Sequence, residues 1–141
     1  MEDGVSFAQL GVADGDRFQR LRHELGVTTF GLNAIAFAPG QAGRIHRHAR
    51  QEEVYLVLEG ELSLMVEGEE HRLGQGALAR VAPGVRRQLV NRRPERLLLL
   101  ALGGAHEHEG RDGEAFASWE DAAGRPPQEV PLPDDVPVEP A

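Results

Sequence analysis

Short apolar runs, separated by glycine or proline, fill the chain from residue 27 to residue 104. Several of these runs alternate apolar with polar positions and contain β-branched or aromatic residues, as half-buried strands do. The expected strands cover residues 27–38, a segment around His46 and His48, and residues 53–58, 61–66, 71–73, 77–81, 86–91 and 96–102. Many short strands joined by tight turns predict an all-β barrel or sandwich of the jelly-roll type.

The last run, from Leu97 to Leu102, is apolar at every position. Such a strand must be covered on both faces, because its side chains point alternately to the two sides of the sheet. One cover is the barrel interior. The other is either the N-terminal segment or a second subunit, and a homodimer is therefore expected.

The segments outside the strand-rich region carry weaker patterns. Residues 14–26 are predicted as a short amphipathic helix, with Phe18 and Leu21 on its apolar stripe and Gly26 at its end. Residues 112–121 are predicted as a second short helix. The end of the chain is rich in Pro, Glu and Asp and has no apolar period. The expected parts are an N-terminal segment with a short helix (1–26), a β-barrel (27–104), a C-terminal loop and short helix (105–123) and a flexible acidic tail (124–141).

The composition limits the kinds of partner that such a barrel can bind. The chain has 141 residues, a formal net charge of −8 and no cysteine. One domain is expected, and any metal must be held by His, carboxylate or water. An acidic chain does not attract nucleic acid phosphates. No apolar run is long enough to cross a bilayer and the N-terminus has no apolar leader, so no membrane partner and a cytoplasmic location are expected.

Candidate chemistry gathers between residues 40 and 60. In an extended chain His46 and His48 lie on one face, because successive strand residues point to opposite sides. Glu53 opens the next apolar run and shares a face with Tyr55. If the two strands are neighbours, two imidazoles and one carboxylate converge. That ligand set holds a divalent metal and leaves coordination positions open.

The same segment resembles the first motif of the cupin family, a group of small double-stranded β-helix barrels. The motif consists of Gly40, His46, His48, Glu53 and Gly60, with five, one, four and six residues between them. In cupins the two His and the Glu of this motif bind a metal. The resemblance implies an all-β, double-stranded β-helix (jelly-roll) barrel with short peripheral helices, and a metal site at His46, His48 and Glu53.

A second cupin motif, which supplies a fourth ligand His in the family, matches only in its framework. Gly76, Gly84 and Asn91 stand at their offsets, Pro83 lies one place late, and Arg87 occupies the position of the His. A guanidinium stays protonated and offers only donors, so it does not coordinate a metal. At most three ligands remain.

Two interpretations are open. In the first, the three ligands hold Fe, Mn, Ni or Zn, and Arg87 grips the carboxylate or phosphate of a small organic acid. Tyr55 then either lines the pocket or packs in the core. In the second, Arg87 pairs with Glu53 in place of the metal, and the barrel is a metal-free binding or sensing module. The expected partner is a small-molecule ligand, anionic in the first interpretation, and the sequence does not decide whether the protein is an enzyme.

Three more residues near the predicted site have two interpretations each. His106 and His108 form a second His-x-His pair after the last strand, which is either a surface loop or the source of a replacement ligand. Arg44 lies on the same face of the extended chain as His46, so it either lines the pocket entrance or is a surface charge.

Overall fold

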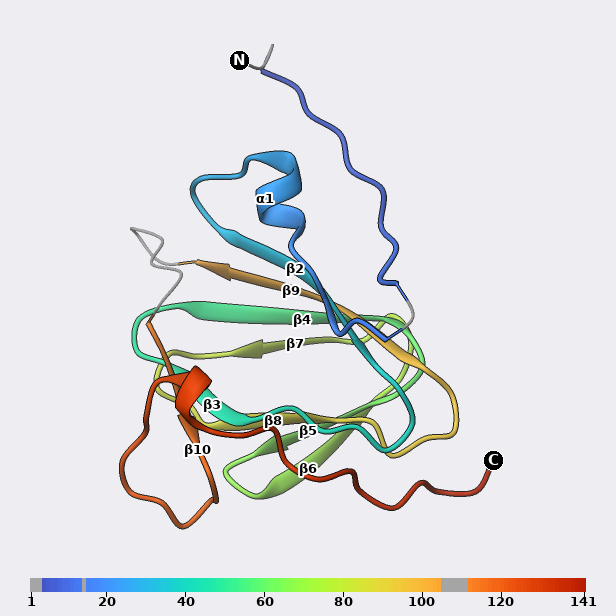
Figure 1. Ribbon diagram of the computed structural model, residues 1–141, viewed down its shortest axis with the longest axis vertical. Coiled ribbons are helices and arrows are strands. Elements are labelled where there is room, and N and C mark those ends of the chain that lie inside the picture. Colours follow the sequence, from blue (N-terminus) through green and yellow to red (C-terminus); the bar gives the residue numbers. More distant parts are fainter. Residues whose placement is uncertain (1–3, 14, 105–111) are drawn as a thin grey trace.

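Two five-stranded antiparallel sheets face each other in the computed structural model, which describes residues 4–13, 15–104 and 112–141 (Figure 1). The first sheet contains, in order from one edge to the other, β1 (Phe18–Gln19), β2 (Gly31–Phe37), β9 (Leu97–Gly104), β4 (Glu52–Glu59) and β7 (Leu78–Val81). The second sheet contains β10 (Gly113–Phe116), β3 (Ile45–His48), β8 (Arg87–Val90), β5 (Leu62–Val66) and β6 (Glu69–Leu73). Each predicted strand is present, and the all-β jelly-roll prediction is confirmed.

The core lies between the sheets and consists of the inward residues of alternating strand positions. On β9, Leu99 and Ala101 are buried and stand opposite Val57 and Tyr55 of β4. Opposite residues share a face, so each pair adds a contact to one continuous apolar cluster. Burying a Val or Leu side chain stabilises the fold by about 1.5–3 kcal/mol. This packing fixes the position of β4, the strand that carries Glu53.

The outer face of β9 is covered in part by the N-terminal segment, which is one of the two predicted covers. Leu98 and Leu100 pack against a cluster that contains Val12 and Leu21. Leu21 begins α1 (Leu21–Leu25), which lies over β2 in Figure 1. The other cover, a second subunit, stays a prediction.

The helix predicted over residues 14–26 is shorter in the structure. Phe18 and Gln19 form β1, which pairs with the edge of β2, and of residues 15–26 only the five of α1 are helical. An isolated helix of this length is marginal, whereas pairing with an open sheet edge satisfies backbone groups at once. The predicted end is correct, since Gly26 adopts the left-handed conformation with φ of 75°.

The helix predicted over residues 112–121 is wrong. Residues 113–116 form β10, which pairs antiparallel with β3, so that Gly113 lies opposite His48. On its other side β3 pairs with β8, and without β10 the outer edge of β3 would leave backbone groups unpaired. Sheet pairing therefore outweighs the helical pattern, and the sheets include strands from outside the predicted barrel range 27–104.

The C-terminal tail, predicted to be flexible, is hydrogen-bonded to the barrel. After the 3-10 helix η1 (Pro127–Glu129), Val130 is buried, and the N–H of Val136 donates to the carbonyl oxygen of Gly40 at 2.8 Å. Near the end of the tail, the carboxylate of Glu139 accepts two hydrogen bonds from the guanidinium of Arg72 on β6. In Figure 1 the tail runs along the second sheet. It is therefore part of the folded domain.

Two glycines of the first motif occupy positions that other residues cannot adopt without strain. Gly40 and Gly60 have φ values of 84° and 82°, in the left-handed region. A Cβ on Gly40 would lie 2.9 Å from the carbonyl oxygen of Val136, and one on Gly60 would collide with the carbonyl oxygen of Arg96. These glycines mark tight turns where two parts of the chain approach closely.

The second His-x-His pair falls outside this description, because His106 and His108 lie beyond the described residues. Their predicted role stays a prediction. Within the described ranges, no helix combines the length and the apolar character needed to cross a membrane.

Candidate metal and ligand site

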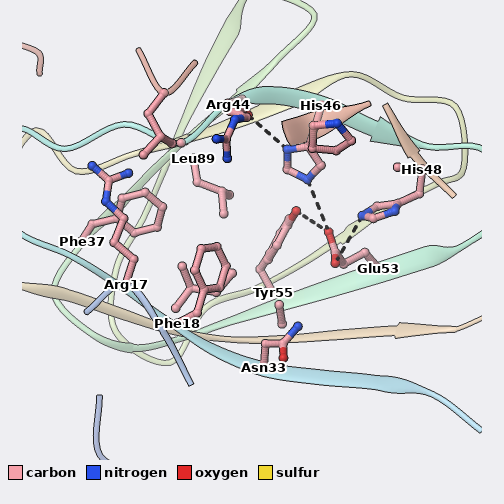
Figure 2. A pocket seen from close by; sticks show the side chains of 16 residues that line it. Arg17, Phe18, Asn33, Phe37, Arg44, His46, His48, Glu53, Tyr55 and Leu89 are labelled. Atoms are coloured by element: carbon pink, nitrogen blue, oxygen red, sulfur yellow. Dashed lines mark hydrogen bonds and ion pairs between the residues drawn. The ribbon is translucent and has the colours of Figure 1, made fainter. Parts of the chain in front are cut away.

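The three predicted metal ligands meet between the two sheets. His46 and His48 come from β3 in the second sheet and Glu53 from β4 in the first, and the short connection between these strands brings them together (Figure 2). Nε2 of His46 lies 3.9 Å from Oε1 of Glu53, and Nε2 of His48 lies 3.7 Å from Oε2. One ligand atom from each residue lies within 4.8 Å of the other two. The arrangement is close enough for the three residues to share one ion.

Each imidazole is oriented by an acceptor at its Nδ1 atom. Nδ1 of His48 lies 2.8 Å from Oδ1 of Asp112, and Nδ1 of His46 lies 3.1 Å from the carbonyl oxygen of Arg44. An acceptor at this position favours the tautomer with the proton on Nδ1. The Nε2 lone pairs then remain free on the side that faces Glu53, where a metal would bind.

Asp112 is held in place by the connection between β3 and β4. Its Oδ2 atom accepts hydrogen bonds from the backbone N–H groups of Arg50 and Gln51, both at 2.9 Å. Burial alone would raise the pKa of Asp112, but these bonds and the contact with His48 lower it below its usual value. The carboxylate therefore stays ionised. The sequence holds no local signal for this role, because Asp112 lies 64 positions from His48.

A buried cation pairs with Glu53. Nη2 of Arg87 lies 2.7 Å from Oε1 of Glu53, and the hydroxyl of Tyr55 donates to the same oxygen. Nε of Arg87 in turn donates to the Tyr55 oxygen at 3.2 Å. Burial would raise the pKa of Glu53, but the contact with His46 and the charge of Arg87 lower it far below its usual value. Oε1 is thus engaged, and Oε2 faces His48.

The two predicted ligand-binding residues are placed differently. Tyr55 lines the cavity beside the site, and burial together with the charge of Glu53 raises its pKa well above the usual value, so its hydroxyl stays a donor. Arg87 has no exposed side-chain surface and is not among the residues that line the cavity. The Arg87 pair with Glu53 was expected in the metal-free interpretation, and the converged ligands were expected in the metal interpretation. The structure contains both features.

A cavity of about 290 Å³ adjoins the ligand set between the two sheets. Its apolar lining includes Phe18, Ile35, Phe37, Leu89, Ala101 and Leu132. Figure 2 shows the His and Glu side chains at one end of this space. Cavities with apolar walls and a few convergent polar groups are typical binding sites for small molecules.

Two arginines also line the cavity. The sequence left open whether Arg44 lines the pocket entrance or is a surface charge, and the structure shows that it lines the cavity. Arg17 is a lining residue that the sequence did not identify, because it lies in the segment predicted as a helix. Only the pairing of the neighbouring strand β1 with β2 brings Arg17 to the cavity.

Comparisons with known proteins agree with this architecture. A model of the cupin domain matches residues 34–103, a range that contains all three predicted metal ligands. A search of the curated proteins finds no match.

Several solved structures are similar to the chain. A sugar phosphate isomerase of the cupin superfamily from Silicibacter pomeroyi is 26% identical, with a TM-score of 0.65 over 82% of this chain and 79% of that one. A cupin 2 conserved barrel domain protein from Salinispora arenicola is also 26% identical, with a TM-score of 0.57 over 68% and 81%. A cupin protein from Bacteroides fragilis shares the fold at 24% identity, with a TM-score of 0.61 over 78% and 92%. Together with the glycine, histidine and glutamate spacing of residues 40–60, the cupin-domain match over residues 34–103 shows that the chain belongs to the cupin family.

Proposed function

We propose that the protein binds a divalent metal ion through His46, His48 and Glu53, and that the metal takes a small anionic ligand from the adjoining cavity. The observation that carries this proposal is the orientation of the imidazoles. Both have an acceptor at Nδ1 and present Nε2 toward the Glu53 carboxylate. An acceptor at the second ring nitrogen is the usual support of a metal-binding His.

The donor set limits the choice of metal. Two imidazoles and one carboxylate, in a chain without cysteine, suit Fe, Mn, Ni or Zn and leave positions open for a ligand. Tyr55 and Arg87 both bond Oε1 of Glu53. Oε2 is therefore the oxygen available for coordination.

The charge of Arg87 favours an anionic ligand. Its guanidinium already neutralises Glu53, so a bound dication would keep its charge in a partly buried site. At an effective dielectric constant of about 20, a guanidinium and a divalent ion about 5 Å apart repel each other by roughly 7 kcal/mol. A carboxylate or phosphate group on the metal offsets this repulsion. Similarity to a sugar phosphate isomerase supports the same class of ligand, a small organic acid or phosphate ester.

A metal-free binding module is the second candidate, and one observation favours it. The ion pair between Arg87 and Glu53 is short, and Tyr55 bonds the same carboxylate oxygen. This part of the site is electrically neutral without a metal. The cavity would then bind its ligand through imidazole and guanidinium donors alone.

Elemental analysis of protein purified without chelator separates the two candidates. The wild type is compared with His46→Ala, with Arg87→His, and with His71→Ala, a control that removes an exposed His of β6 outside the ligand set. We expect about one metal per chain in the wild type and in the control. His46→Ala should lose the metal, and Arg87→His should gain occupancy, because it removes a repelling charge and adds a donor. Trace metal in all four proteins would contradict the metal site and support the metal-free module.

A further inference from the structure

Two arginines on the cavity wall lack a carboxylate partner of the kind that Glu139 provides to Arg72. Nε of Arg44 donates to the carbonyl oxygen of Val130 at 2.6 Å, and Nη1 of Arg17 donates to the carbonyl oxygen of Ala42 at 3.2 Å. Among the described residues, neither guanidinium forms an ion pair. Each guanidinium has five N–H donors, so most of its hydrogen-bonding capacity remains available to a ligand.

Arg44 is placed on the same cavity as the proposed metal ligands. It precedes His46 by two residues, and both line the cavity. Figure 2 shows its guanidinium turned toward the cavity, on the same side as His46. Residues two apart in an extended chain are about 6.6 Å apart. A ligand of a few carbon atoms can therefore reach both the metal and this guanidinium.

The charge balance of the cavity adds a second argument. Arg17 also lines the space, and its guanidinium lies 5.8 Å from the ring centre of Phe37. Because Arg87 neutralises Glu53, the charges of Arg17 and Arg44 have no carboxylate counterpart among the described residues that line the cavity, although the chain as a whole carries a net charge of −8. Apolar walls strengthen the attraction of such a site for an anion.

We propose that Arg44, assisted by Arg17, binds the anionic group of the ligand. The site then takes a small molecule with a carboxylate or phosphate at one end and a metal-binding group at the other. This inference deepens the proposed function and rests on it only for the metal-bound end. It gives Arg44 the anion-binding role that the second motif suggested for Arg87, whose side chain is enclosed beside Glu53.

Isothermal titration calorimetry with three probes of the same carbon skeleton tests the inference. Glycerol 3-phosphate carries a phosphate, glycerate carries a carboxylate and glycerol carries neither, while all three have adjacent hydroxyl groups. Each probe is titrated into the metal-free and the zinc-loaded forms of the wild type, Arg44→Met, Arg44→Lys and Arg96→Met. Arg96 is the matched control, because it also donates to a backbone carbonyl, that of Val12, yet does not line this cavity.

We expect the wild type and Arg96→Met to bind at least one of the two anions and to prefer it to glycerol. Arg44→Met should bind that anion about tenfold more weakly or worse, as expected for the loss of a charged hydrogen bond. Arg44→Lys should fall between them, because it keeps the charge but loses the planar fork. The relative affinities of glycerate and glycerol 3-phosphate identify the preferred anion.

Equal anion affinity in the wild type and Arg44→Met would overturn the inference, as would a wild type that binds neither anion at millimolar concentration. Zinc content, measured on the same samples, distinguishes this failure from failure of the metal site. Anion binding that depends on Arg44 in the metal-free protein supports the inference even if the wild type holds no zinc. Full zinc occupancy without Arg44-dependent anion binding refutes the inference and leaves the metal site intact.

Discussion

The two motif segments that frame the interior both begin at a glycine but carry opposite chemistry. Residues 40–60 and 76–91 both begin with a left-handed glycine, at φ of 84° for Gly40 and 85° for Gly76. The first segment supplies two imidazoles and a carboxylate to one point. The second places Arg87 directly opposite His46 in the pairing of β3 with β8. One segment thus supplies ligands for a cation, and the other supplies a cation of its own.

This difference shows that the backbone of a ligand position can persist when its chemistry has changed. The strand pairing that would bring a fourth imidazole to the site is intact, and Arg87 uses it to reach Glu53. Opposite residues on neighbouring strands share a face, so the arginine cannot avoid the site. Under the proposed function, a metal bound there would meet an excess of positive charge, and an anionic ligand would offset it.

Among the variants that test this comparison, removal of the buried Arg87 cation should have the largest effect, a loss of stability. In Arg87→Met the Glu53 carboxylate loses its counter-ion, and breaking a buried ion pair costs about 3–5 kcal/mol. The free energy of unfolding in urea measures the loss. Arg80→Met, which removes a largely exposed partner of Glu52, is the control and should cost about 1 kcal/mol or less.

A double variant refines the same test. Replacing Glu53 by Gln together with Arg87→Met removes both charges, and most of the lost stability should return. Equal small losses in the two single arginine variants would show that Glu53 does not depend on Arg87. The second segment would then be a passive neighbour of the first.

A smaller effect is expected at the support of His48. Asp112→Asn keeps the shape of the side chain but removes the charged acceptor at Nδ1, and changes of this kind weaken metal binding by about 10-fold to 100-fold. Competition with a chromophoric chelator measures the affinity. Glu114→Gln, which lies two residues further on in β10 and is paired with Arg47, is the control. Equal affinity in Asp112→Asn and Glu114→Gln would show that the orientation of His48 does not depend on Asp112.

The smallest expected effect is a difference in stability between alanine substitutions at the first glycine of each segment. Gly40→Ala and Gly76→Ala both place a side chain in the left-handed region, at about 1–2 kcal/mol each. At Gly40 the new Cβ also meets the carbonyl oxygen of Val136, whereas nothing lies within 4 Å at Gly76. Thermal unfolding should show Gly40→Ala as the less stable variant by about 1 kcal/mol. Identical losses would mean that the C-terminal tail moves aside without cost.

The three candidate ligands could be predicted from the local sequence for a simple reason. His46, His48 and Glu53 lie within eight consecutive residues, so the alternation of strand side chains and one short connection suffice to predict that they meet. The presence of Arg87 at the position of the fourth ligand His is equally visible in the sequence. The direction of the Arg87 side chain is not visible there, because burial against Glu53 and Tyr55 depends on how two sheets pack.

The sequence by itself determined the two-sheet architecture and the three candidate ligands, because strand periodicity and turn glycines act over a few residues. Only the tertiary structure decided that residues 113–116 extend the sheet as a strand, which places Asp112 against His48. It also decided that Arg44 faces the cavity while Arg87 is enclosed. These outcomes depend on which strand edge is open and which side chain the packed core covers, and neither is a property of a short stretch of sequence.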